Sequence, residues 1–350
     1  FRIGKTLKNK AKRYYTVDNS IYENRKSAGN VIDKEAGILN RGNLTRLKNF
    51  LNRAAQGERL TVGFIGGSIT QGFAATAPDK CYAARTVAWL RKVFPNTEFD
   101  YVNAGIGATN SQFGAARVQE DLLCRLPDLV MVEFSVNDHC TPHDMETYEG
   151  LIRQIYGSRS CPAMVLLHSV YYDTGKSAAY YHAQIGRHYD LPCISMQNSI
   201  YPAVAAGRLP AEKITADFLH PNDLGHEFMV AVIMNFLEKV IHDKTEEQQE
   251  IFPAPLTENA YEHCARLQYF NSTPEKSGFE EDMTPQRGIT DIFRNGWSAG
   301  EKGAYLEFAF RGTGAAVQYR RVKDGPAPIA TACPKPVMKM RKQLICAVRQ

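Results

Sequence analysis

The sequence has 350 residues, 44% of them hydrophobic and 23% charged, which is ordinary globular composition, and no apolar run is long enough for a transmembrane helix. The net charge of +5 comes from the ends: residues 1–13 contribute +6, residues 320–350 contribute +7, and the segment between them carries −8. Basic tails can contact anionic polymers, but we interpret these ends as solvated, and no nucleic-acid-binding motif occurs.

The first 58 residues are predicted to form an N-terminal extension. Residues 1–36 are polar and irregular. A helix is expected over 43–55, where apolar residues recur at helical spacing before Gly57.

Between residues 59 and 245, apolar runs alternate with helical patterns, which predicts an α/β domain with a parallel sheet and helices on both faces. Strands are expected over 60–65, 99–103, 128–134, 163–170 and 192–196. Helices are expected from an Asp79 cap through Val93, over 113–123, 145–156, 176–189 and 200–206, and after Pro221.

The organisation changes after His242. Residues 246–278 are polar and contain three prolines, which predicts a linker. Residues 279–332 are predicted to be β-rich, with a hairpin over 305–321 around Gly312 and Gly314. One hairpin is not stable alone, so it must pack on the main domain or belong to a larger β module that is cut short here. Residues 333–350 show no strand period and stay unassigned.

The eight cysteines form no C-x-x-C pair, and several lie in apolar patterns, as reduced buried thiols do. A chain with this much core does not need a disulfide framework, so we expect a reducing compartment, the cytoplasm. Because the sequence begins at Phe1 rather than Met, a removed signal peptide and secretion stay open as the alternative.

Ser68 is the first candidate for chemistry. The apolar run 60–65 stops at Gly66-Gly67, and Ser68 follows at once, at the carboxyl end of the first parallel strand. Ligands bind at this edge in open α/β sheets, so Ser68 is a candidate nucleophile. The alternative is that Ser68 only caps a helix or closes a turn.

Two further loops follow predicted strands and carry groups suited to acyl transfer. The loop after 99–103 contains Gly105-Ile106-Gly107, whose amides no large side chain obstructs. The loop after 128–134 contains Asn137, a side-chain donor. The Ser68 amide, the Gly107 amide and the Asn137 side chain can converge on an oxyanion, because all three loops lie at one sheet edge.

A nucleophilic serine needs a base, and the base needs an orienting acceptor. Asp217 and His220 lie three apart in a loop, where a turn can bring carboxylate and imidazole together. Asp223 and His226 have the same spacing but fall in the first turn of a helix, where an acid is explained by the helix dipole. We therefore prefer Asp217 and His220.

Four blocks, GGSIT, NAGIGAT, SVND and DFLHPNDLGH, occur in this order, and over residues 59–242 the chain resembles the SGNH hydrolases, or GDSL-type esterases and lipases. The resemblance implies a flavodoxin-like three-layer α/β/α fold. It implies that Ser68 is the nucleophile, with His220 as base and Asp217 as its orienter. It also implies that Gly107 and Asn137 complete the oxyanion hole.

Two positions depart from the family pattern. Gly67 stands where many members have Asp, and Ser135 stands where the common form has Gly. Neither departure removes a catalytic group. The GGSIT form together with a β-rich companion segment is similar to bacterial members that deacylate carbohydrates.

Other kinds of site fit less well. Thr70 replaces the second glycine of a G-x-S-x-G elbow, there is no phosphate loop, and GIGATN lacks the third glycine of a dinucleotide fingerprint. His139 and His143 are four apart with two acids nearby, but we interpret them as loop polarity rather than as metal ligands. We expect no metal and no cofactor.

The first hypothesis is therefore a serine esterase that removes O-acetyl groups from a sugar or polysaccharide through an acyl-enzyme. An acyltransferase that uses the same residues is the second, and a non-catalytic carbohydrate-binding protein is the third. The expected partner is an acyl ester substrate, without nucleic acid and without a membrane span. The acyl chain length, the sugar and the oligomeric state stay open.

Overall fold

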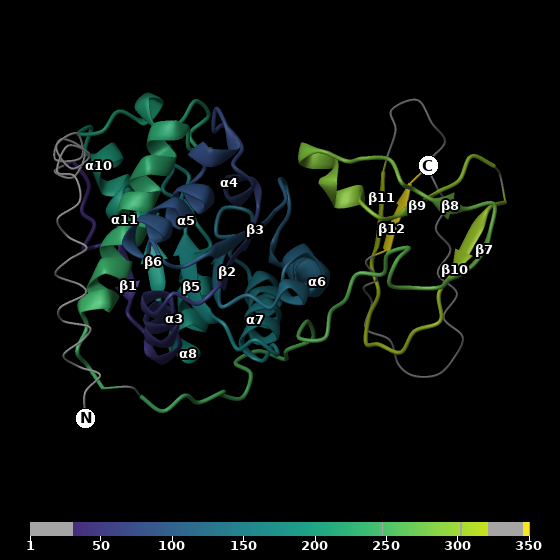
Figure 1. Cartoon of the computed structure of the whole chain (residues 1–350). Helices are drawn as coiled ribbons and strands as arrows, with labels where there is room; N and C mark the ends of the chain where they lie inside the picture. The colour runs from purple at the N-terminus through teal and green to yellow at the C-terminus, as the bar shows by residue number, and fades with distance from the viewer. Residues whose placement is uncertain (1–30, 247, 302, 321–345, 350) are drawn as a thin grey trace.

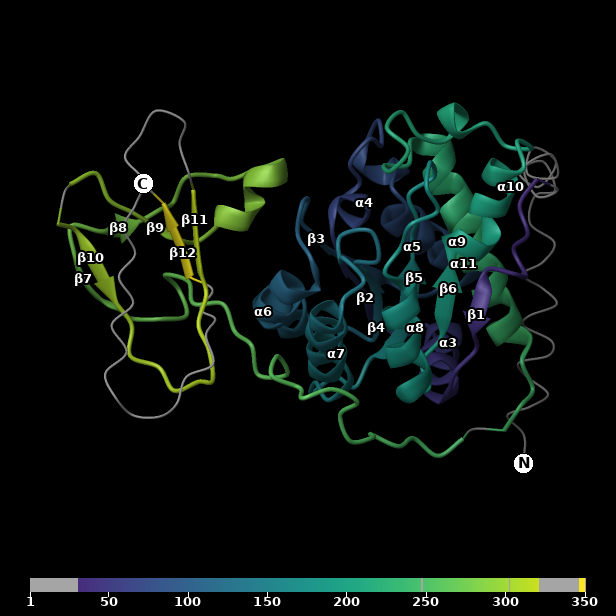
Figure 2. The same cartoon turned by 180° about the vertical axis from the view of Figure 1, so that it is seen from behind.

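The computed structural model describes residues 31–246, 248–301, 303–320 and 346–349 (Figure 1). Within these residues the chain forms an α/β domain and a smaller C-terminal module of β-strands, joined by a long connecting segment (Figure 2). Most of the predicted N-terminal extension, residues 1–30, lies outside the described part, as do residues 321–345. The predicted domain boundaries stay predictions.

The α/β domain is built on a six-stranded sheet of order β1-β6-β5-β4-β2-β3. Five strands are parallel, as predicted, and β1 is antiparallel to β6, with Ile38 opposite Ile194. Strand β1 was not predicted from the sequence, and its antiparallel pairing makes the sheet mixed rather than purely parallel. In chain order the strands are β1 (Ile38–Asn40), β2 (Leu60–Gly66), β3 (Phe99–Gly105), β4 (Leu129–Glu133), β5 (Ala163–His168) and β6 (Cys193–Ser195).

Helices cover both faces of the sheet, which confirms the predicted three layers (Figure 1). Because side chains alternate along a strand, Leu129 and Met131 of β4 face one layer while Val130 and Val132 face the other. The first layer contains α3 (Thr45–Gln56), α5 (Tyr82–Val93), α9 (Met196–Ser199), α10 (Tyr201–Ala205) and α11 (Asp223–His242). The second contains α6 (Ser111–Asp121), α7 (Pro142–Tyr156) and α8 (Ala179–His188).

Several predicted helix starts differ from the observed ones. Asp79 does not cap α5: it lies in a short 3-10 turn, η1 (Pro78–Lys80), and the cap is Cys81, whose Sγ accepts from the Ala84 amide. Helix α7 begins at Pro142, because Thr141 caps it and forms a capping box with Asp144 in its first turn. Helix α8 begins at Ala179 rather than at residue 176.

The segment after α11 runs along α7 before it reaches the module (Figures 1 and 2). The Glu149 carboxylate in α7 accepts from the Leu256 amide at 2.6 Å and from the Thr257 amide at 2.8 Å. The Gly150 backbone lies against Tyr261, where a Cβ on Gly150 would meet the Tyr261 carbonyl carbon at 2.6 Å. This part of the predicted linker is therefore fastened to the α/β domain.

The C-terminal module contains two small sheets around buried Trp297 and Phe279. The predicted hairpin over 305–321 was wrong. Strand β10 (Tyr305–Glu307) pairs antiparallel with β7 (Glu275–Ser277), whereas β11 (Val317–Arg320) pairs in parallel with β12 (Cys346–Arg349). The second sheet also contains β8 (Glu280–Glu281) and β9 (Trp297–Ser298).

The module contacts the α/β domain on the side of β3 and α6 (Figure 1). The Arg266 guanidinium lies over the Phe113 ring, 5.1 Å from its centre, and Arg294 pairs with Asp121 at 3.5 Å. A 3-10 helix of the module, η4 (Gly288–Phe293), contributes a third contact, to Gln71.

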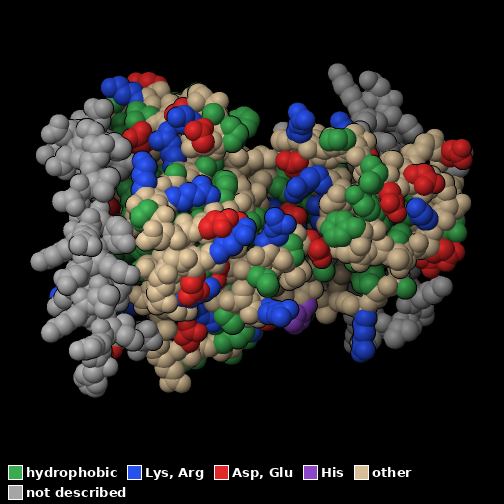
Figure 3. All heavy atoms as spheres, in the orientation of Figure 1, with side chains coloured by type: hydrophobic (Ala, Val, Ile, Leu, Met, Phe, Trp, Pro, Cys, Tyr) green, Lys and Arg blue, Asp and Glu red, His purple; other side chains and the backbone are tan. Residues whose placement is uncertain are grey.

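On the face drawn in Figure 3, Lys and Arg side chains are intermingled with Asp and Glu. No helix among the described residues is long and apolar enough to cross a membrane. The cysteine side chains that the structure describes are free thiols, and Cys81 and Cys193 among them are buried.

Candidate active site

Ser68 lies at the carboxyl end of β2, as predicted, where it begins the four-residue helix α4 (Ser68–Gln71). Glycine is needed at Gly66, before this turn, and at Gly105 in the neighbouring strand, because backbone segments pack closely there. A Cβ on Gly66 would lie 2.5 Å from the Glu133 carbonyl oxygen, and one on Gly105 would lie 2.6 Å from the Thr70 carbonyl carbon. The Ser68 amide is at the first turn of the helix, where backbone N–H groups have no partner within the helix.

The Ser68 hydroxyl, His220 and Asp217 form a hydrogen-bonded chain. His220 Nε2 lies 2.8 Å from Ser68 Oγ, and His220 Nδ1 lies 2.6 Å from Asp217 Oδ2. Ser68 is buried, and the His220 side chain is 16% exposed. The ring centre of Phe73 lies 4.5 Å from that of His220, which limits the directions in which the imidazole can move.

A tight turn holds the Asp217 carboxylate beside the His220 ring. Its Oδ1 accepts from the amides of Leu219 at 3.0 Å and His220 at 2.8 Å. Partial burial opposes ionisation, but the hydrogen bonds from the His220 ring and from these two amides outweigh it and hold the pKa of Asp217 well below its usual value. Asp217 is therefore a carboxylate that can orient an imidazole and stabilise its positive charge.

Phe218, between these two residues, adopts the left-handed region with φ of 61°. Its carbonyl accepts from the Tyr172 amide at 2.7 Å, and its side chain is 48% exposed. A bulky residue at positive φ is strained. Such strain is common where the surrounding structure fixes the direction of functional side chains, as this turn does for His220.

Gly107 lies beside Ser68: a Cβ on Gly107 would be 3.7 Å from the Ser68 Cβ. Its amide donates to the Gln71 side chain, with 3.0 Å between N and Oε1. The predicted oxyanion donor is thus close to the nucleophile but already has an acceptor.

Asn137 lies over the Gly67 backbone, close enough that a Cβ on Gly67 would overlap the Asn137 side chain. Its Oδ1 is buried and makes no hydrogen bond. The neighbouring Asp138 anchors the loop, because it accepts from the Ser111 amide at 2.9 Å and pairs with His182 Nε2 at 2.8 Å. The three predicted loops and the Asp217–His220 loop therefore meet at one edge of the sheet.

Ser135, one of the departures from the family pattern, is buried at the end of β4. Its hydroxyl and amide both donate to Glu133 Oε1, at 2.8 and 3.1 Å. Burial is the main cause that raises the pKa of Glu133, to about 7, although these hydrogen bonds act in the opposite direction. The Ser135 side chain thus supports a buried acid beneath the Asn137 loop.

The second Asp–His pair has other partners. Asp223 accepts from the amide and the hydroxyl of Thr76, at 2.8 and 2.6 Å. His226 is buried in α11, where its Nδ1 accepts from the Tyr82 amide at 3.2 Å. Burial and the charge of Arg85 lower the pKa of His226 to about 4.

His143 lies in the first turn of α7 rather than in a loop, and its Nε2 is 3.3 Å from Gln112 Oε1. The His139 amide donates to Asp144, the capping residue of the same helix. Among the residues that the structure describes, no group of three or more His, Cys, Asp or Glu side chains could hold a metal ion.

Three residues at this site, Gln71, Phe73 and Asp291, were not predicted from the sequence. Gln71 lies three residues after Ser68, a spacing that places two side chains on one helix face, which was an available signal. Nothing local connects Asp291 with this site, because it is 220 residues from Gln71, to which it is hydrogen bonded.

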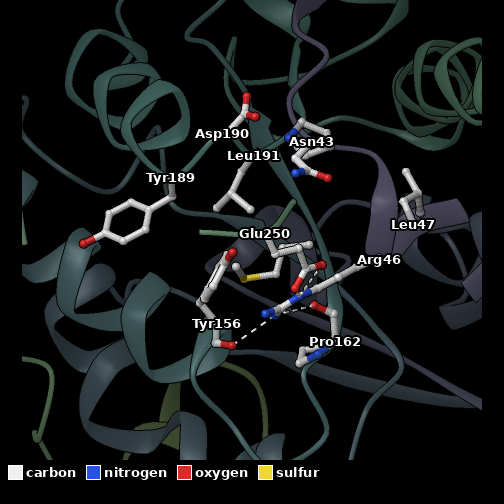
Figure 4. A pocket seen from close by; sticks show the side chains of 11 residues that line it. Asn43, Arg46, Leu47, Tyr156, Pro162, Tyr189, Asp190, Leu191 and Glu250 are labelled. Carbon is white, nitrogen blue, oxygen red and sulfur yellow. Dashed lines mark hydrogen bonds and ion pairs between the residues drawn. The ribbon is translucent and has the colours of Figure 1, made fainter. Parts of the chain in front are cut away.

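A small pocket lies at the opposite edge of the sheet, near the starts of β5 and β6 (Figure 4). Arg46 crosses it and donates to the carbonyls of Tyr156 and Pro162, at 3.0 and 3.4 Å. It also pairs with Glu250 at 2.9 Å. The ion pair with Glu250 fastens the connecting segment to α3. None of the predicted catalytic residues lines this pocket.

Comparison with known proteins agrees with this geometry. Residues 64–228 match the model of the GDSL-like Lipase/Acylhydrolase family. Two crystal structures of a two-domain esterase (CEX) active on acetylated mannans, one co-crystallized with mannopentaose, are each 50% identical to this chain. Each comparison covers 78% of this chain and 74% of the other, with TM-scores of 0.72 and 0.74.

The acetylxylan esterase Axe2 from Geobacillus stearothermophilus also matches, at 19% identity over 52% of this chain and 96% of the other, with a TM-score of 0.42. A search of curated proteins finds no match. The family model and the 50% identity to the CEX esterase together establish the family. The chain is an ester-hydrolysing enzyme that belongs to the SGNH, or GDSL-like, lipase and acylhydrolase family.

Proposed function

We propose that this protein is a serine esterase that removes O-acetyl groups from a polysaccharide of the acetylated-mannan type. The observation that carries the proposal is the hydrogen-bonded chain from Ser68 Oγ through His220 to Asp217, with distances of 2.8 and 2.6 Å. This arrangement has the roles of nucleophile, base and orienter in the order that acyl transfer needs.

In the acylation step, Ser68 Oγ attacks the acetyl carbonyl while His220 Nε2 takes the hydroxyl proton. Asp217 accepts from Nδ1–H and stabilises the imidazolium. The carbonyl oxygen becomes an oxyanion, which the Ser68 amide, the Gly107 amide and the Asn137 side chain stabilise. When the tetrahedral intermediate collapses, the C–O bond to the sugar breaks, and His220 returns its proton to the sugar oxygen.

Deacylation repeats the same steps with water as the nucleophile. His220 takes a proton from water, the resulting hydroxide attacks the acetyl carbonyl, and the same three donors hold the second oxyanion. Collapse breaks the bond between Ser68 Oγ and the acetyl carbon and returns the proton from His220 to Ser68 Oγ, and the acetic acid that is released ionises to acetate in water.

The substrate class is supported by the CEX esterase, which is active on acetylated mannans and is 50% identical to this chain. The similarity covers 78% of this chain. The exposed Phe73 ring lies 4.5 Å from the His220 ring, and Phe218, two residues before His220 in the chain, is also exposed, so the apolar face of a sugar can pack against exposed aromatic side chains in this region.

The test measures acetate release from acetylated mannan and the hydrolysis of p-nitrophenyl acetate by the wild type and by Ser68→Ala. We expect turnover of both by the wild type and loss of both in the variant, with an unchanged circular dichroism spectrum. Unchanged turnover in Ser68→Ala would refute the proposed nucleophile. Activity on acetylated xylan but not on acetylated mannan would refute the substrate class.

The same assay separates hydrolysis from transfer. With a free mannooligosaccharide present, a hydrolase yields free acetate, whereas an acyltransferase yields newly acetylated oligosaccharide. We expect free acetate as the main product. A folded wild type that a serine-directed fluorophosphonate fails to label would instead favour a non-catalytic carbohydrate-binding protein.

A further inference from the structure

The Gln71 side chain connects the C-terminal module with the proposed oxyanion hole. Its Oε1 accepts from the Gly107 amide at 3.0 Å, and its Nε2 donates to Asp291 Oδ2 at 3.1 Å and to the Gly288 carbonyl at 3.4 Å. These partners define the orientation of the carboxamide, because a flipped group would place two donors together at Gly107 and two acceptors together at Asp291.

The Gly107 amide has one hydrogen, and the proposed mechanism needs that hydrogen for the oxyanion. In this structure it points to Gln71 instead. A substrate whose carbonyl oxygen is to reach the Gly107 amide must therefore replace Gln71 Oε1. Because Gln71 and Ser68 lie on one face of the short helix α4, this replacement takes place directly beside the nucleophile.

The hydrogen bond to Asp291 holds the Gln71 side chain next to the Gly107 amide. Asp291 lies in η4 of the module, and its carboxylate is a strong acceptor for the Gln71 Nε2. The module is itself docked through Arg266 on Phe113 and through the Arg294–Asp121 ion pair. The position of η4 beside α4 thus fixes the Gln71 carboxamide, whose Oε1 accepts the hydrogen bond of the Gly107 amide.

We propose that Gln71 is a positioning residue that closes the Gly107 donor in the free enzyme, and that Asp291 of the C-terminal module holds it there. This inference rests on the proposed function of Gly107. It makes the module a determinant of oxyanion affinity: a shift of η4 that loosens the contact between Asp291 and Gln71 opens the donor.

The test uses the full chain and a boronic acid, which forms a tetrahedral adduct with a nucleophilic serine and resembles the oxyanion intermediate. Its inhibition constant is measured together with kcat and KM for p-nitrophenyl acetate. Gln71→Leu replaces the competing acceptor with an apolar side chain of similar size. Asp291→Ala keeps Gln71 but removes the carboxylate that holds its side chain in place. We expect each variant to lower the inhibition constant roughly threefold to tenfold, the range of one neutral hydrogen bond.

Two comparisons separate this role from a structural one. In Gln71→Leu, the added Asp291→Ala is expected to have no further effect, because Asp291 acts through Gln71. Gln71→Glu is expected to raise the inhibition constant, because a carboxylate still accepts from Gly107, is repelled by Asp291 and places negative charge beside the oxyanion. If Gln71 had only a structural role, Gln71→Leu and Gln71→Glu would change the inhibition constant in the same direction.

Glu262→Ala is the matched control. It removes another contact between the connecting segment and the α/β domain, the ion pair with Arg153 at 2.7 Å, without touching Gln71, and should leave the inhibition constant unchanged. An unchanged or raised constant in Gln71→Leu, or an independent effect of Asp291→Ala in that background, overturns the inference while leaving the esterase intact. A wild type that boronic acids do not inhibit would count against the proposed function itself.

Discussion

The side chain of Asn137 occupies the space where a Cβ on Gly67 would lie: such an atom would overlap Oδ1 and be 2.9 Å from Cγ. Gly67 is one of the two positions at which this chain departs from the common family pattern. In this chain, a side chain at position 67 would displace the Asn137 amide from its place against the backbone that precedes Ser68.

Gly67→Ala should therefore lower kcat for p-nitrophenyl acetate by about tenfold or more, since the Asn137 donor must move away from the oxyanion. Asn137→Ala should lower it by roughly 10²–10³, the scale of one lost oxyanion donor. The double variant should be no slower than Asn137→Ala alone, because Gly67 acts through Asn137. Fully additive losses would contradict this explanation.

The two Asp–His pairs make opposite predictions. Asp217→Asn should lower kcat by roughly 10² or more, because the amide cannot stabilise the imidazolium and can hold the ring in the wrong tautomer. Asp223→Asn should change kcat less than about threefold, because Asp223 accepts from Thr76 and not from a catalytic group. Steady-state kinetics of both variants, with melting curves as the folding control, decide between the pairs. If Asp223→Asn lost most of its kcat while Asp217→Asn kept nearly all of it, His226 rather than His220 would be the catalytic base.

The predicted site residues that the structure brings together share one property: each lies in the loop after a predicted strand or inside one short turn. The parallel sheet then brings Ser68, Gly107 and Asn137 together without further information. Asp217 and His220 are three residues apart, so one turn suffices to join them.

The elements that were missed depend on contacts distant in sequence. Strand β1 has three residues and pairs with β6 about 150 residues later, too short to produce a recognisable pattern. In the module, β10 pairs with β7, although β8 and β9 lie between them in the sequence. The apparent hairpin pattern of 305–321 was therefore misleading. The contact from Gln71 to Asp291 is of the same kind, and only the folded chain reveals it.

Glu149 should be a main attachment point of the connecting segment. Its carboxylate accepts from the Leu256 and Thr257 amides, the Thr257 hydroxyl and the Tyr189 hydroxyl. Glu149→Ala leaves these donors without their acceptor, at a cost of about 1–3 kcal/mol for a buried group. We expect a lower melting temperature and faster proteolysis between residues 250 and 262.

Glu250→Ala is the comparison for this prediction. It removes a partly exposed ion pair with Arg46 in the same segment, where a pair of this kind contributes about 0–1 kcal/mol. Melting curves and limited proteolysis with mass spectrometry should therefore show a smaller change than for Glu149→Ala. Equal changes in the two variants would mean that the hydrogen bonds of Glu149 do not hold the segment.

Glu133 should make stability fall with rising pH. Burial is the first cause of its raised pKa, about 7 against a reference of 4.5, and the Ser135 hydrogen bonds offset only part of it. Between these two values the folded state keeps a proton that the unfolded state has released. The proton's stabilising effect is fully present below the unfolded pKa and is lost as pH rises through the folded pKa, by about 3 kcal/mol in all.

Glu133→Gln removes this dependence, because an amide does not titrate. Buried His168 and His226, whose pKa values burial lowers to about 3 and about 4, contribute the opposite slope but are unchanged in both proteins, so the difference between variant and wild type isolates Glu133. We expect the free energy of unfolding in urea, measured at about pH 5 and about pH 7.5, to fall less with pH in the variant than in the wild type. Parallel pH profiles would show that Glu133 titrates as an ordinary carboxyl despite its burial at the end of β4.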